Sequence, residues 1–294
     1  MVWCSGWRLA TAVSEAGGLG LIGAGSMHPD VLAEHIEKCR AATGKPFGVN
    51  VPVFYPEIEK IIGLLIEKKV PVVFTSGGNP ALYTSKLKDA GVMVAHVVAS
   101  AKFAVKAATA GVDAVVAEGF EAGGHNGRDE ITTMALIPQV RAAIDLPLIA
   151  AGGIATGGGM LAAMALGADG VQVGTRFALS AESSAHEDFK RLCITLGEGD
   201  TMLCLKKLTP VRLIRNAFFN RVAEVEARGA DAAELREILG SRRSKRGIFE
   251  GDLVEGELEI GQVASMVREI KPAGDIVREM VAGFEQGVQK IKQW

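Results

Sequence analysis

A glycine-rich loop at residues 118–127 carries the side chains best suited to chemistry. It reads Glu-Gly-Phe-Glu-Ala-Gly-Gly-His-Asn-Gly, so four glycines surround an imidazole, an amide and two acids. Such a segment is costly to order and packs little apolar surface, and loops of this kind are usually functional. His125 is the candidate catalytic residue, because histidine takes up and releases a proton most readily near neutral pH.

The other four histidines are expected to be structural, as lone histidines usually are. His35 is expected on a solvated helix face, and His28 and His186 show no motif. His96 ends a predicted strand and could line the same site as His125, at the carboxyl ends of the strands.

Two glycine turns predict an anion site. Residues 150–159 (Ala-Ala-Gly-Gly-Ile-Ala-Thr-Gly-Gly-Gly) and 172–177 (Gln-Val-Gly-Thr-Arg-Phe) each follow an apolar run. The first turn leads into a helix, whose N-terminal N–H groups favour an anion. Loops after the seventh and eighth strands of a barrel commonly hold phosphate. The G-x-G-x-x-G at residues 18–23 is not a dinucleotide fingerprint, because it lies inside a strand and does not open a helix.

Further polar residues end predicted strands or form a basic cluster. Asn50 and Ser76 could face a bound ring. The cluster Arg242, Arg243, Lys245 and Arg246 could bind a cofactor phosphate or an acidic carrier protein, although such runs are more often solvated loops. No metal-binding motif and no G-x-S-x-G nucleophile motif is present in the sequence.

The elements that must position these residues follow a strand–helix repeat. Short runs rich in Val, Ile and Leu, apolar on both alternating faces, predict parallel strands at 19–24, 47–51, 70–75, 92–97, 112–117, 146–150 and 170–173. Helical patterns separate them at 30–42, 57–69, 79–90, 101–110, 134–144 and 158–166. A helix at 7–16 precedes the first of these strands, so we predict an α/β fold, a (β/α)8 TIM-type barrel with its first strand truncated. An open doubly wound sheet is the alternative.

The remaining chain is more charged and more helical. Helices are predicted at 185–196, 210–228, 232–239, 260–270 and 274–293, and 242–259 is predicted to be irregular. The predicted organisation is a barrel core at 1–180, an inserted helical and irregular substrate-side lobe at 181–260, and C-terminal helices closing the barrel at 261–294.

Composition excludes several classes of protein. Of the 294 residues, 48% are hydrophobic and 22% charged, which is typical of a globular chain. The net charge of −2 shows no overall excess of basic residues of the kind that binds nucleic acid. No apolar run is long enough for a membrane span. The sequence begins without a secretory signal pattern, so a cytoplasmic location is expected. The 36 glycines favour tight turns and close backbone–ligand approaches.

Together these segments resemble the FMN-dependent barrel family that contains nitronate monooxygenases (2-nitropropane dioxygenases) and the flavin-type enoyl-acyl-carrier-protein reductase. The resemblance covers essentially the whole chain. It is carried by Met1-Val-Trp, residues 16–23, Phe47-Gly-Val-Asn, Thr75-Ser-Gly-Gly-Asn-Pro, residues 118–127, Ala150-Ala-Gly-Gly-Ile-Ala and Gln172-Val-Gly-Thr-Arg-Phe. The family ends its first strand in Gln-Gly-Gly-Met, of which only Met1 is present here.

The resemblance implies FMN as cofactor and NADH or NADPH as co-substrate. It places the flavin phosphate at Gly152, Gly153, Gly174 and Thr175, and His125 beside the reactive face. Other residues implied to contact the flavin are Met1, Asn50, Ser76, Glu118, Gly123, Gly124 and Gln172.

The resemblance favours the reductase, because Glu121-Ala-Gly-Gly-His, Thr132-Thr-Met and the segment 247–253 are more like that activity. An enoyl-acyl-carrier protein or enoyl-CoA would then receive hydride at its β-carbon, and His125 would give or position the α-carbon proton. The alternatives are a nitronate monooxygenase that consumes O2 and a non-catalytic flavin-binding module. A homodimer is also left open.

Overall fold

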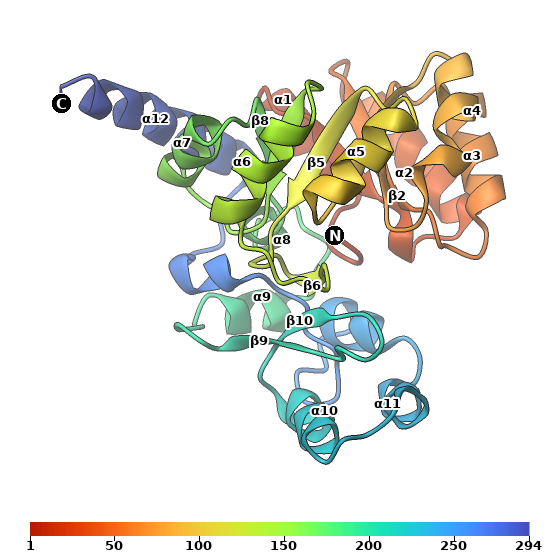
Figure 1. The fold of residues 1–294 in the computed structure, drawn as a ribbon, viewed down its shortest axis with the longest axis vertical. Coiled ribbons are helices and arrows are strands. Elements are labelled where there is room, and N and C mark those ends of the chain that lie inside the picture. Colours follow the sequence, from red (N-terminus) through yellow and green to blue (C-terminus); the bar gives the residue numbers. More distant parts are fainter. Residues whose placement is uncertain (294) are drawn as a thin grey trace.

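A curled sheet of seven parallel strands forms the body of the protein (Figure 1). The computed structural model describes residues 1–293. The strands run in the order β1-β2-β3-β4-β5-β7-β8. Their bounds are β1 (Gly20–Gly23), β2 (Phe47–Pro52), β3 (Val72–Ser76), β4 (Met93–Val98), β5 (Ala114–Glu118), β7 (Leu148–Ala151) and β8 (Gly170–Gln172). All seven predicted strands are therefore present.

The side chains of these strands alternate between two apolar layers. In β5, Val115 and Ala117 belong to the core beneath the helices, whereas Ala114 and Val116 belong to a second cluster inside the sheet. That inner cluster also includes Leu21 of β1 and Ile149 of β7, which lie far apart in the strand order. The sheet must curl around this cluster, which makes the fold barrel-like and excludes the open-sheet alternative.

Helices follow the strands along the chain, as the repeat predicted. They are α1 (Trp7–Glu15), α2 (Pro29–Ala42), α3 (Ile58–Glu67), α4 (Thr84–Asp89), α5 (Ala101–Thr109), α6 (Thr133–Ala143), α7 (Gly157–Ala165) and α8 (Thr175–Ala178). Short 3-10 turns lie at η1 (Ala24–Ser26) and η2 (Pro80–Leu82).

The first five residues lie between the two edge strands of the curled sheet. Among the described residues, no backbone pairing joins β1 to β8. Ser5 accepts a hydrogen bond from the N–H of Gly23, 2.9 Å, and its hydroxyl donates to Leu21. A β-carbon at Gly174, just after β8, would lie 3.7 Å from the sulfur of Met1. Met1 therefore lies at the carboxyl ends of the edge strands, where the cofactor was predicted.

A lobe lies against these carboxyl ends, below the barrel in Figure 1. It contains a three-stranded antiparallel sheet of β6 (Gly124–His125), β10 (Val211–Ile214) and β9 (Thr201–Cys204). Its helices are α9 (Glu187–Cys193), α10 (Ala217–Ala227), α11 (Ala232–Leu239), the π-helical turn η3 (Lys245–Phe249) and the 3-10 turn η4 (Gln262–Met266).

The prediction of one helix over 210–228 is wrong. Residues Val211–Ile214 form β10, and the helix begins only at Ala217, after Asn216 caps it by accepting from the N–H of Phe219, 2.9 Å. The helix predicted over 260–270 is also wrong, because only η4 forms and Val267 is extended. The predicted irregular segment 242–259 contains η3.

The C-terminal helix α12 (Ala273–Ile291) packs against α7 and α1 of the barrel, and its outer end projects from the body (Figure 1). Ala264 and Val267 belong to the apolar core of the lobe, whereas Ile276 and Met280 belong to that of the barrel. The chain therefore returns from lobe to barrel between residues 267 and 276. The division into three segments stays a prediction.

Candidate active site

Parallel pairing gathers the predicted polar residues at one end of the barrel. In the strand register Glu118 pairs with Ala151, and Ala151 pairs with Gln172, so these three residues form one row. On the far side of the sheet Pro52 pairs with Ser76, and the hydroxyl of Ser76 donates to the Asn50 side-chain oxygen, 3.4 Å. Carboxyl ends of barrel strands are where active sites are built.

Gln172 carries an unsatisfied buried group at this end of the barrel. Its Oε1 atom is buried and has no hydrogen-bond partner among the described residues. Leaving a buried carbonyl without a donor costs about 1–3 kcal/mol, and such groups are often functional. An orphaned acceptor in the same row as Glu118 fits a ligand that offers a hydrogen-bond donor, as the ring of a flavin does.

Glu118, two strands away in the same row, has a desolvated carboxyl. Burial of its carboxyl raises the pKa of Glu118 to about 7. A carboxyl that keeps its proton near neutral pH is a hydrogen-bond donor, whereas a carboxylate only accepts. A bound group thus meets a hydrogen-bond donor at Glu118 and an acceptor at Gln172 in this row.

This raised pKa predicts a pH dependence of stability in the flavin-free protein. Between the ordinary carboxyl value of 4.5 and the folded value of about 7, the folded state binds more protons than the unfolded chain. The contribution of Glu118 to the free energy of unfolding should therefore fall as pH rises through this window, by up to about 3 kcal/mol. Below about pH 6.5 the buried His96, whose pKa is lowered to about 4, contributes with the opposite sign, so the comparison with a Glu118 variant isolates the contribution of Glu118. Urea unfolding from pH 5 to 8 measures the slope.

Glu118→Gln should flatten this slope, and Glu198→Gln, at an exposed position, is the matched control. Part of the slope should persist, because burial also raises the pKa of Glu257, to about 8. An unchanged slope in Glu118→Gln would show that this carboxyl ionises normally.

The predicted phosphate loop has the backbone an anion needs. Gly152 and Gly153 have φ angles of 85° and 71°, a region that favours glycine. Among the described residues, the N–H groups of Gly152, Gly153 and Gly174 donate to no protein acceptor. Helix α7 begins directly afterwards, capped by Thr156, which accepts from the N–H of Gly159, 3.1 Å. Free N–H groups beside a helix N-terminus fit the phosphate of FMN.

Segment 259–261 of the lobe closes this site from the other side. The N–H of Gly261 donates to the hydroxyl of Thr175, 3.0 Å. A β-carbon at Gly123 would lie 2.5 Å from the nitrogen of Gly261, and one at Gly124 would lie 2.5 Å from a carboxyl oxygen of Glu259. Close packing against the backbone of the lobe therefore requires glycine at position 123, and a φ of 74° favours glycine at position 124. Their contact with flavin stays a prediction.

His125 lies on β6 at the junction of barrel and lobe. Its partner across the strand pair is Val211, so it is held by a sheet and not by a free loop as the sequence suggested. The side chain is exposed, and the ring of Phe54 lies 6.5 Å away between centroids. An accessible imidazole on a fixed backbone suits proton transfer to a bound substrate.

The structural expectation for His96 is confirmed, its alternative place at the barrel mouth is not, and the solvated position expected for His35 is wrong. His96 is buried, its Nδ1 lies 2.7 Å from the hydroxyl of Thr75, and burial lowers the pKa of His96 to about 4. It is a structural group in the core. His35 is half-buried and accepts from the N–H of Trp7, 3.2 Å, so it does not lie on a solvated face.

Arg212 anchors the glycine-rich loop at residues 118–127 and is not among the residues predicted from the sequence. It is 1% exposed on β10 and donates to the carbonyl oxygen of Phe120, 2.9 Å, and to that of Thr201, 3.4 Å. Its guanidinium also covers the ring of Phe120, 4.5 Å from the centroid. On the opposite flank, the carboxylate of Glu121 accepts from the N–H of Thr133, 3.0 Å, at the start of α6.

Arg212→Met should lower the free energy of unfolding by about 3 kcal/mol, because it leaves two carbonyl groups with no donor in the protein interior. Urea unfolding measures the change. Arg191→Met, at an exposed position on α9, is the control and should stay within about 0.5 kcal/mol of the parent. Equal stability of the two variants would refute the anchoring role.

No cluster of three or more His, Cys, Asp or Glu side chains that could hold a metal ion occurs within residues 1–293. None of the described helices has the length and apolar character to cross a membrane.

A family model and a solved structure both match nearly the whole chain. The family model described as "Nitronate monooxygenase" matches residues 1–62 and 54–283. The structure of FabK from Thermotoga maritima has a TM-score of 0.95 and 42% identity, covering 100% of this chain and 93% of that one.

Two curated relatives cover most of both chains. A (3aS,4S,5R,7aS)-5-hydroxy-7a-methyl-1-oxo-octahydro-1H-indene-4-carboxyl-CoA dehydrogenase from Rhodococcus jostii is 31% identical over 96% of this chain and 90% of its own. A "Probable nitronate monooxygenase" from Staphylococcus aureus is 33% identical over 84% of this chain and 82% of its own.

Proposed function

Because this chain belongs to the nitronate monooxygenase family of flavin-dependent oxidoreductases, we propose that it is an FMN-dependent enoyl-acyl-carrier-protein reductase. Its substrates would be 2-enoyl thioesters of an acyl-carrier protein or of coenzyme A, and its reductant NADH or NADPH. The observation that carries this proposal is the 42% identity to FabK over the whole chain. The likeness to a carboxyl-CoA dehydrogenase supports a thioester substrate.

The residues of the site have separate tasks in this proposal. FMN, when bound, supplies hydride transfer between the nicotinamide and the β-carbon of the enoyl group. Gly152, Gly153 and Gly174 would hold its phosphate with their free N–H groups, and Glu118 and Gln172 would meet its ring. His125 would deliver a proton to the α-carbon, since it is exposed at the mouth of the barrel.

Oxidation of alkyl nitronates is the second candidate function. The family model and the Staphylococcus aureus relative favour it. The same site would then act without a nicotinamide, and O2 would be consumed.

Two assays on the FMN-loaded protein separate these functions. We expect oxidation of NADH or NADPH that depends on crotonyl-CoA under anaerobic conditions, and little O2 uptake with propyl-2-nitronate. Rapid O2 uptake with the nitronate and no reduction of the enoyl thioester would replace the proposal by the second function.

A further inference from the structure

A cavity of about 230 Å³ lies on the lobe side of His125. Apolar side chains of the β9–β10 hairpin form one wall, and the carboxyl of Glu259 lines it near His125. Arg242 lines the cavity from the segment that follows α11. The space therefore adjoins the candidate catalytic residue but is formed mainly by the lobe.

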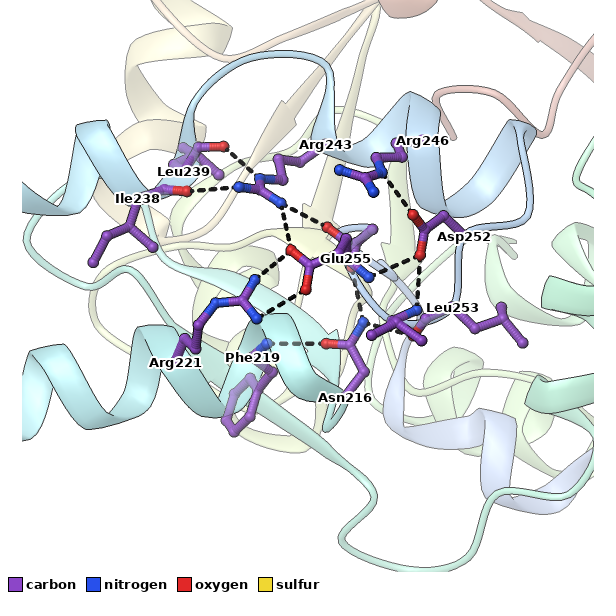
Figure 2. Close-up of polar contacts among 12 residues, drawn as sticks. Asn216, Phe219, Arg221, Ile238, Leu239, Arg243, Arg246, Asp252, Leu253 and Glu255 are labelled. Atoms are coloured by element: carbon purple, nitrogen blue, oxygen red, sulfur yellow. Dashed lines mark hydrogen bonds and ion pairs between the residues drawn. The ribbon is translucent and has the colours of Figure 1, made fainter.

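Three of the four cations in the basic cluster are paired with carboxylates of the protein. Figure 2 shows Arg243 donating to the carbonyl oxygens of Ile238 and Leu239 and to Glu255, the last at 3.2 Å. Arg246 pairs with Asp252, 2.6 Å, in the same view. Lys245 pairs with Glu250, 3.0 Å. Each of these three cations is therefore already compensated by a neighbouring carboxylate.

Arg242 differs from its neighbours. It is exposed, and among the described residues its guanidinium has neither an ion-pair nor a hydrogen-bond partner. Its φ of 61° lies in the left-handed region, which costs a non-glycine residue about 1–3 kcal/mol. The bonds of Arg243 on the next residue fix this backbone. Strain of this kind persists where the surrounding structure imposes it, and it is concentrated at ligand sites.

We propose that this cavity binds a phosphate ester, with Arg242 as its anion-binding residue. The inference rests on the proposed function, because both substrates of that reaction carry such a group. One source is the phosphopantetheine arm of the acyl thioester, and the other is the 2′-phosphate on the adenosine of NADPH. A guanidinium binds either through paired N–H···O contacts.

The acidic residues of the cavity are compatible with an anion. Glu257 and Glu259 both line it and interact with each other. Burial raises the pKa of Glu257 to about 8 and also raises that of Glu259. At neutral pH the two together therefore carry less than their full negative charge, which lowers the repulsion of a phosphate.

Calorimetric titration of the FMN-loaded protein tests the site with two ligand pairs that each differ by one phosphate. The pairs are 4′-phosphopantetheine with pantetheine, and NADP+ with NAD+. Arg242→Ala should weaken binding of the phosphorylated member of at least one pair about 10-fold, and Arg242→Lys should weaken it less. Pantetheine and NAD+, which lack the phosphate that distinguishes each pair, should bind unchanged. Whichever pair responds identifies the source, and a response in both means that the ligands share the site.

Arg236→Ala is the matched control, because Arg236 is exposed on α11 and does not line the cavity. The proposal is overturned if the wild type does not prefer the phosphorylated member of either pair, if Arg242→Ala affects both members equally, or if Arg236→Ala has the same effect. These results are independent of turnover. If the protein reduces crotonyl-CoA but Arg242→Ala does not change phosphate binding, only the proposed phosphate site is refuted. If Arg242→Ala weakens phosphate binding but the protein does not reduce crotonyl-CoA, only the proposed reductase function is refuted.

Discussion

His125→Ala should bind FMN normally and reduce enoyl thioesters about 10²–10⁴-fold more slowly, the usual contribution of a positioned proton donor. The side chain is exposed and makes no hydrogen bond within the described residues, so its removal should leave the fold intact. The rate at which NADH or NADPH reduces the bound flavin should be much less affected. Stopped-flow recording of the loss of flavin absorbance, without enoyl substrate, measures this rate. That half-reaction needs no proton at the α-carbon.

The split between the two half-reactions distinguishes chemistry from assembly of the site. His28→Ala is the control, since His28 is exposed and its side-chain partner is Glu57, which is not among the residues of the candidate site. An equal loss in both half-reactions of His125→Ala would mean that His125 builds the site or binds the nicotinamide. The proton-donor role would then be withdrawn.

The barrel could be predicted because its information is local. Each buried parallel strand is a short run of β-branched residues, and each helix carries its own periodicity. Parallel pairing then places all strand ends at one edge, so Glu118 and Gln172 could be expected together from their positions alone. The same reasoning predicted that the two glycine turns, at residues 150–159 and 172–177, lie at this edge as well.

The lobe could not be predicted in this way, because long-range pairing forms it. His125 belongs to a strand only because Val211 lies opposite it, far away in the chain. Residues 211–214 contain Val, Leu and Ile, which fit a strand or the start of a helix equally well without that partner. Arg212 gives no local signal either, since its acceptor belongs to Phe120. Its one hint was an arginine within an apolar run.

Gly153→Val should reduce FMN affinity at least about 100-fold while the barrel still folds. A β-carbon there would lie 3.3 Å from the Glu121 side chain, which is flexible enough to move slightly. The φ of 71° would nevertheless be unfavourable by about 1–2 kcal/mol for valine, so the loop should relax and turn its N–H groups away. Losing two charge-assisted hydrogen bonds to a phosphate, at about 1.5–3 kcal/mol each, gives the expected factor.

Gly158→Ala is the matched control in the same turn. Its φ is not in the left-handed region, and a β-carbon would meet nothing closer than the Thr156 hydroxyl at 3.8 Å. Alanine there should leave FMN affinity within about 2-fold and stabilise α7 slightly, because alanine favours the helix over glycine. Fluorescence titration of the apoprotein with FMN measures both variants, and far-UV circular dichroism checks their folding. Tight binding by a folded Gly153→Val protein would mean that the phosphate is held elsewhere, since this turn could no longer present its N–H groups to it.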